Sequence, residues 1–65
     1  MDTRTYYYFK EVTKDMNITK TAARLFMSQQ TLSNHILRLE KHFGVPLFHR
    51  KPALSLTYAG EIVLS

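Results

Sequence analysis

The segment SQQTLSNHILRLEKHFG, residues 28–44, carries an apolar residue at nearly every third or fourth position. These apolar residues recur at i, i+4, i+7 and i+11, within about 60° of one another on a helix: Leu32, Ile36, Leu39 and Phe43. Ser28 is a natural N-cap, and Gly44 with Pro46 after it ends a helix. The segment therefore predicts a helix between Ser28 and Gly44 that buries one apolar seam.

The opposite face of this helix is polar and nearly free of acids. Short amide and hydroxyl side chains stand near its beginning: Gln29, Gln30, Ser33 and Asn34. A solvated helix face usually carries more glutamate, whereas Glu40 is the only carboxylate between Ser28 and Phe43. A DNA major groove, about 12 Å wide, accepts one helix, and Gln and Asn can pair with adenine there. The alternative is that these residues only solvate the helix. Leu37 also falls on this outer side, without an explanation.

Two further helices are expected before this segment. The first spans Asp2 or Thr3 to Asp15 and places three apolar residues on one face: Phe9, Val12 and Met16. Tyr7 is expected to be the most exposed member of the aromatic run at residues 6–9.

The second helix is expected to begin with Thr19 as its N-cap. Its apolar stripe consists of Ile18, Ala22 and Leu25, with Phe26 beside it. Lys20 and Arg24 point away from that stripe, and Met27 can pack on Leu32 at the start of the third helix. Two helices joined by a tight turn in this way form a helix-turn-helix.

Residues 47–56 predict a short β-hairpin, because two extended runs flank Lys51-Pro52-Ala53 and proline favours the turn. Thr57 then caps a fourth helix. The expected fold is mainly α: a winged helix-turn-helix with a three-helix core, a hairpin wing and the start of a linker helix. The domain is expected to span residues 1–57, and residues 58–65 begin a linker and dimerisation helix. Gly60 in that helix is either a close-packing point or a weak spot.

The positive charge is concentrated in the middle of the chain. Nine Lys and Arg residues against five Asp and Glu give a net charge of +4. Residues 1–19 balance, whereas residues 20–57 hold six basic residues against Glu40 alone. Such an imbalance is expected where one surface meets a polyanion, and a solvated basic surface without a partner is the alternative.

Composition excludes several other classes of protein. The 65 residues contain no cysteine, so neither disulfides nor cysteine-ligated zinc stabilise the fold. The longest apolar run is too short to span a membrane. His35 and His42 would lie about 10.5 Å apart along one helix, too far to share an ion, so no metal is expected. A chain this small is not expected to be an enzyme, and no cofactor is expected.

Several spaced motifs resemble one family. Leu25-x-x-Ser28-Gln29-x-x-Leu32-Ser33 and the Ile36, Leu39 and Glu40 that follow resemble the helix-turn-helix core of LysR-type transcriptional regulators. The segments at residues 44–50 (GVPLFHR) and 56–61 (LTYAGE) continue the similarity in the same order.

The resemblance implies the N-terminal DNA-binding domain of a bacterial, cytoplasmic transcription factor. It implies a homodimer formed through the helix that begins near Thr57, bound to double-stranded DNA at an interrupted palindrome. A small-molecule effector would act only through a sensing domain that these residues do not contain.

The resemblance also assigns candidate DNA contacts. Gln29 and Ser33 match positions that approach bases, whereas Gln30 stands where proline is frequent and Asn34 where arginine is usual. Arg50 and Lys51 are the nearest cations to a wing that lacks a tip arginine. The expected backbone contacts are Thr19, Lys20, Ser28, Thr31, Arg38, Lys41, Arg50 and Lys51.

Two other hypotheses remain open. A winged-helix module can mediate protein–protein association, in which case the face of Gln30, Asn34 and Arg38 would meet a protein. A small stand-alone regulator with no sensing domain is the other.

Overall fold

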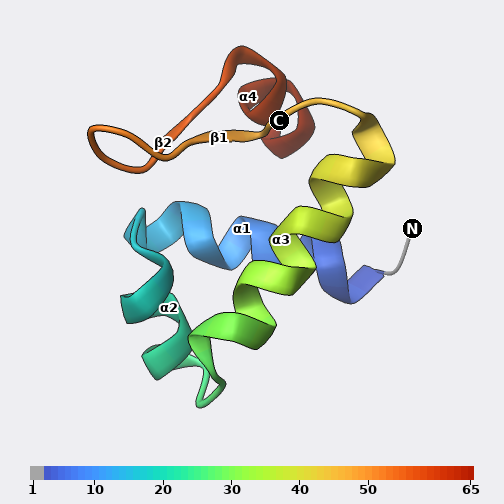
Figure 1. The fold of residues 1–65 in the computed structure, drawn as a ribbon. Coiled ribbons are helices and arrows are strands. Elements are labelled where there is room, and N and C mark those ends of the chain that lie inside the picture. Colours follow the sequence, from blue (N-terminus) through green and yellow to red (C-terminus); the bar gives the residue numbers. More distant parts are fainter. Residues whose placement is uncertain (1–2) are drawn as a thin grey trace.

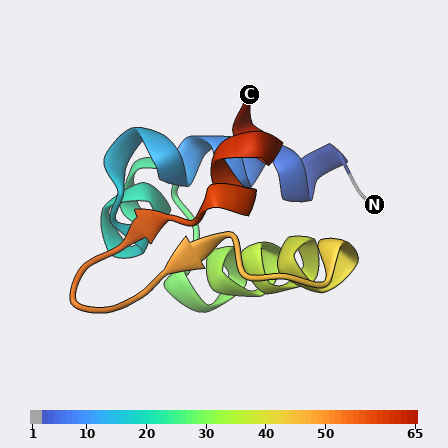
Figure 2. The same ribbon diagram turned by 90° about the horizontal axis from the view of Figure 1, so that it is seen from above.

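A computed structural model describes residues 3–65 as three crossing helices, a hairpin and a short fourth helix (Figure 1). In chain order the elements are α1 (Thr3–Asp15), α2 (Ile18–Arg24), α3 (Gln29–Phe43), β1 (Phe48–His49), β2 (Ser55–Leu56) and α4 (Tyr58–Leu64). Seen from above, α1 and α3 run along opposite sides of the molecule, and the hairpin and α4 lie over them (Figure 2). This is the winged helix-turn-helix that the sequence predicts; Asp2, the alternative start of α1, lies outside the described residues.

The core forms where the apolar faces of α1 and α3 meet. Its wholly buried apolar side chains are Phe9, Val12, Leu32, Ile36, Leu39 and Leu47. Phe48 from β1 closes the core, with its ring centroid 5.4 Å from that of Phe9. The predicted seam of α3 is thus confirmed for three of its four members. Phe43, the last residue of α3, is the exception, since it is 42% exposed.

The ends of the helices follow local capping chemistry. Ser28 and Thr57 cap α3 and α4 as predicted, and Gly44 ends α3 in the left-handed region at φ 73°. The predicted cap of α2 is wrong. Asn17, not Thr19, is the N-cap, and its side-chain oxygen accepts a hydrogen bond from the Lys20 backbone N–H at 2.9 Å. Asparagine is a strong N-cap, and capping by Asn17 lets the helix begin at Ile18.

The turn between α2 and α3 also departs from the prediction at one residue. Phe26 adopts φ 56° and is 96% exposed, so it does not extend the apolar stripe of α2. Its left-handed backbone reverses the chain and turns the ring outward. Met27, the next residue, packs against the core instead. Tyr7 on α1 is half exposed, as expected.

The hairpin leads into α4, whose backbone closely approaches the segment before β1. Phe48 pairs with Leu56 and His49 with Ser55 in antiparallel register, and the Lys51–Pro52 peptide bond in the connecting loop is cis. A Cβ atom on Gly60 would collide with the carbonyl oxygen of Leu47, so Gly60 is a close-packing point.

Candidate nucleic-acid interface

The outer face of α3 is solvent-exposed over its whole length. The buried seam holds this helix on α1, so the residues on its other side point away from the fold. Gln29, Gln30 and Asn34 are exposed, and Ser33 is half-buried at the edge of the face. The four predicted base-contacting residues therefore lie on one accessible surface.

The first turn of α3 is capped by Ser28 and has the polarity that favours an anion. The Ser28 hydroxyl oxygen accepts the Thr31 backbone N–H at 3.0 Å, and the hydroxyl donates to the Thr31 hydroxyl at 2.8 Å. Both residues are exposed, and the first turn contains no acidic residue. The positive end of the α3 dipole is therefore open to a negatively charged group.

Two hydrogen bonds orient the amides at this end of α3. Thr19, at the start of α2, donates from its hydroxyl to Gln29 Oε1 at 3.1 Å. Gln30 donates from Nε2 to Asn34 Oδ1 at 3.1 Å, one helical turn along. The first bond was missed from the sequence, because the pattern around Thr19 indicated an N-cap. It joins the two helices at their exposed ends, where it holds the Gln29 amide through its oxygen.

Four of the predicted backbone-contacting cations project into solvent. Lys20 stands at the start of α2, Arg38 and Lys41 on the outer face of α3, and Lys51 in the hairpin loop. Within residues 3–65 none of the four forms an ion pair. Their charges remain available to an external anion.

Arg50 differs, because it is bound to Glu40. Its Nη2 lies 3.0 Å from Glu40 Oε1, while Glu40 Oε2 accepts the backbone N–H groups of Leu47 at 2.7 Å and Phe48 at 3.2 Å. The carboxylate thus fastens the start of the wing to α3. This role was not predicted, because Glu40 and its partners are seven to ten residues apart along the chain.

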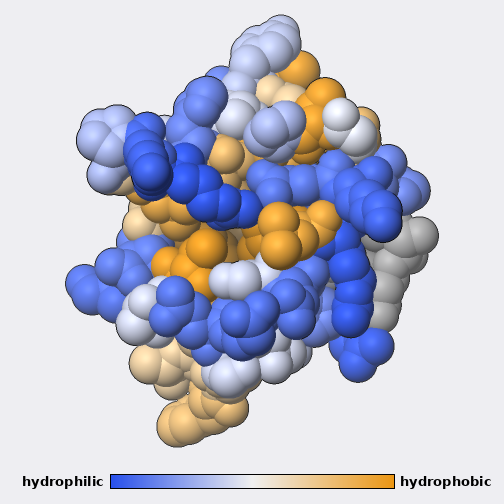
Figure 3. Space-filling model, viewed as in Figure 1, coloured by the Kyte–Doolittle hydropathy of each residue, from blue (hydrophilic) through white to orange (hydrophobic). Residues whose placement is uncertain are grey.

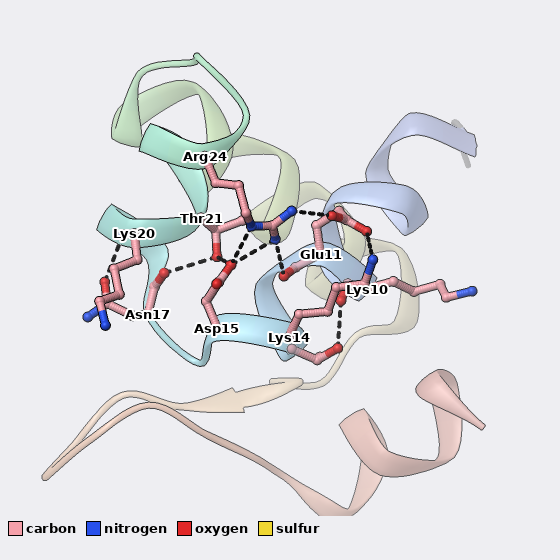
Figure 4. A network of polar contacts seen from close by, with 9 residues as sticks. Lys10, Glu11, Lys14, Asp15, Asn17, Lys20, Thr21 and Arg24 are labelled. Atoms are coloured by element: carbon pink, nitrogen blue, oxygen red, sulfur yellow. Dashed lines mark hydrogen bonds and ion pairs between the residues drawn. The ribbon is translucent and has the colours of Figure 1, made fainter.

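A second ion-pair network fixes α2 against α1 (Figure 4). Arg24 Nη1 lies 2.7 Å from Glu11 Oε1, and its Nη2 lies 2.7 Å from Asp15 Oδ2. Thr21 donates its hydroxyl to the same Asp15 oxygen at 2.7 Å, and Lys14 pairs with Glu11 Oε2 at 2.7 Å. The orientation of the helix-turn-helix relative to α1 depends on these contacts.

The same contacts shift the proton affinities of their members. Hydrogen bonds from Lys14 and then Arg24 lower the pKa of Glu11. Hydrogen bonds from Arg24 and then Thr21 lower the pKa of Asp15, and the two carboxylates raise the pKa of Arg24. Both acids are therefore ionised and internally neutralised at neutral pH, and they add no unpaired negative charge to the surface.

The histidines do not converge. Within the described part of the chain, no three His, Asp or Glu side chains are grouped to hold a metal ion. His35 is buried against the ring of Tyr8, with centroids 4.6 Å apart, and His42 packs edge-on against Phe43.

Among residues 3–65 no helix is long and apolar enough to cross a membrane.

Comparisons of the sequence identify similar proteins. Residues 3–61 match the family model described as the bacterial regulatory helix-turn-helix protein, LysR family. The HTH-type transcriptional regulator BsdA of Bacillus subtilis is 39% identical over 66 residues, and the HTH-type transcriptional regulator XapR of Escherichia coli is 41% identical over 64. These alignments cover 98% and 97% of this chain but only 23% and 22% of the two regulators, so the chain spans less than a quarter of either.

Solved structures agree with this similarity. A LysR-family transcriptional regulator from Eggerthella lenta superposes with a TM-score of 0.89 at 39% identity, covering 97% of this chain and 91% of that one. The CbnR_DBD–DNA complex gives a TM-score of 0.91 at 34% identity and covers 98% of this chain and 75% of that one.

Proposed function

The chain belongs to the LysR family of bacterial regulatory helix-turn-helix proteins, and from this membership we propose that it binds a specific sequence of double-stranded DNA and regulates transcription. The beginning of α3 enters the major groove, because this end of the helix is exposed and free of acids. Such a regulator would act in the bacterial cytoplasm, on chromosomal DNA.

The observation that carries this proposal is the exposed polar face of α3, which lies opposite the buried residues Leu32, Ile36 and Leu39. A helix that presents its amides from a rigid core can place them against base edges with little loss of conformational entropy. The similarity to a structure solved in complex with DNA supports the same conclusion.

We assign base contacts to four residues of α3: Gln29, Gln30, Ser33 and Asn34. Phosphate contacts are assigned to the hydroxyls and cations around them, Thr19, Lys20, Ser28, Thr31, Arg38 and Lys41, and to Arg50 and Lys51 in the wing. Within the wing, Lys51 is the stronger candidate, because Arg50 already shares its charge with Glu40. These contacts position the helix, whereas the amides and Ser33 supply specificity.

The protein is proposed to act as a homodimer that pairs through α4, on an operator with two related half-sites. Tyr58 and Ile62 on α4 are 78% and 55% exposed, which leaves an apolar face open for a partner helix. A small-molecule effector would be bound outside these 65 residues.

The test begins with selection of bound duplexes from a random pool, followed by titration of the selected duplex and a scrambled one over a range of salt concentrations. We expect specific binding that weakens steeply with salt, because phosphate contacts release counterions. Ser33→Ala and Gln29→Ala should each lose about 1–3 kcal/mol on the selected duplex and little on the scrambled one.

Wing and control variants complete the test. Lys51→Ala should weaken both duplexes alike and flatten the salt dependence, whereas Lys10→Ala removes the same charge from α1 and should change neither. Failure to bind any duplex even in dilute buffer contradicts the proposed function.

A further inference from the structure

Leu37 is an exposed apolar residue on the outer face of α3. Its side chain is 53% exposed, although the neighbouring residues on this face are amides and cations. At 100° per residue, Leu37 lies 40° around the helix from Ser33 and 60° from Asn34, about one turn beyond both. It therefore continues the stripe that carries the proposed base contacts.

The surroundings of Leu37 form a shallow, open hollow. Its volume is about 270 Å³, and it is lined by Asn34, Leu37, Arg38 and Lys41. Figure 3 shows apolar surface between hydrophilic side chains over the middle of α3. A leucine held beside two cations that form no ion pair within residues 3–65 indicates an occupant with an apolar group next to negative charge.

DNA offers this combination in its major groove. Thymine carries a C5 methyl group that projects into the groove, and small apolar side chains distinguish thymine through this methyl. The phosphates lie at the edges of the groove, within reach of the long cationic side chains of Arg38 and Lys41 beside Leu37. An apolar protein partner would satisfy Leu37 but would leave Arg38 and Lys41 without counter-charges, so DNA is the better match.

Resting on the proposed DNA binding, we propose that Leu37 packs on the C5 methyl of a thymine and is a specificity-determining residue of this chain. Leu37 lies about 6 Å farther along the helix axis than Ser33, since each residue rises about 1.5 Å. That distance equals about two base-pair steps of roughly 3.4 Å. The thymine should therefore lie one to three base pairs from the base that responds to Ser33→Ala.

The experiment replaces each thymine of one half-site in the selected duplex by deoxyuridine, which removes only the methyl group. We expect that replacing one thymine, one to three base pairs from the base that responds to Ser33→Ala, weakens binding of the unchanged protein about fourfold. This loss is equivalent to about 0.8 kcal/mol for one buried methyl-sized group. In L37A the same replacement should have no effect, so the pair couples in a double-mutant cycle. L37M, which keeps an apolar side chain, should retain the dependence on the methyl.

Val45→Ala is the matched control, because Val45 is similarly exposed, at 43%, but lies outside the hollow. It should leave the deoxyuridine effect unchanged, and thermal unfolding checks that each variant is folded. The proposal is overturned if no replacement of thymine by deoxyuridine weakens binding, or if the replacement weakens binding of L37A as much as that of the unchanged protein. It is also overturned if L37A binds every duplex more weakly by the same factor. Contact of Leu37 with a protein or a second copy would give the first of these results. A failure of the proposed function is different, because then no duplex is selected at all.

Discussion

Replacing Glu40 by alanine should destabilise the fold and loosen the wing. The carboxylate is 13% exposed and accepts two backbone N–H groups, those of Leu47 and Phe48. A hydrogen bond to a charged acceptor contributes about 1.5–3 kcal/mol, and Leu47 and Phe48 are themselves buried. Because water reaches part of this site, we expect a loss of about 2–4 kcal/mol in the free energy of unfolding rather than the full sum.

The assay is urea unfolding followed by circular dichroism, with thermal melting as a second measurement. In a domain of this size each kcal/mol lowers Tm by about 4–8 °C, so the change is readily measured. Glu61→Ala is the control, because it removes an equal charge from an exposed position on α4 and should change stability by at most about 0.5 kcal/mol. Arg50→Ala should cost no more than about 1 kcal/mol, since that ion pair is partly exposed. If Glu40→Ala is no less stable than Glu61→Ala, the two backbone hydrogen bonds do not hold the wing.

Three further predictions concern α1, α2 and α4. Because the pKa values of Glu11 and Asp15 are lowered in the fold, their ion pairs stabilise it above the ordinary pKa values of 4.5 and 3.8. This stabilisation is lost as the pH falls below those values, and the free energy of unfolding measured over an acid titration should show the loss. In Arg24→Gln the loss should be smaller. Gly60→Ala should lower the free energy of unfolding by about 1–3 kcal/mol in chemical denaturation, because the new Cβ meets the Leu47 carbonyl oxygen. The same change at an open helix position would stabilise the protein. Thr19→Val removes the hydroxyl that donates to Gln29, so it should keep the stability of the fold but relax the base preference at the position that Gln29 contacts. Thr19→Ser keeps the hydroxyl and should keep the base preference. An equal base preference in the two variants would exclude a positioning role for the hydroxyl.

The fold was predictable where neighbouring residues determine the structure. The seam of Leu32, Ile36 and Leu39 and the caps at Ser28 and Thr57 are local signals, and all five are confirmed. The errors occurred where local rules conflict with the path of the chain. Phe43 fits the seam by periodicity but is 42% exposed at the end of α3, and Phe26 fits an apolar stripe but adopts a left-handed backbone conformation.

The candidate site was predictable as a face but not as a set of interactions. Helical periodicity is enough to place Gln29, Gln30 and Asn34 on the exposed side of α3. It says nothing about partners on other elements, so the bond from Thr19 to Gln29 was missed. The ion pairs of Arg24 and Arg50 were missed for the same reason, since their partners lie 9 to 13 residues away along the chain.

These internal ion pairs change how the net charge should be interpreted. Of the six basic residues between positions 20 and 57, Arg24 and Arg50 are bound to carboxylates, and the acids that bind them are Glu11, Asp15 and Glu40. The remaining four cations form no ion pair with any described residue, and they lie on α2, on α3 and in the hairpin loop. Acids that could repel a polyanion are therefore occupied in holding α1, α2 and the wing together. Lys20, Arg38, Lys41 and Lys51 therefore account for the unpaired positive charge of residues 20–57, which a count of charges along the sequence cannot reveal.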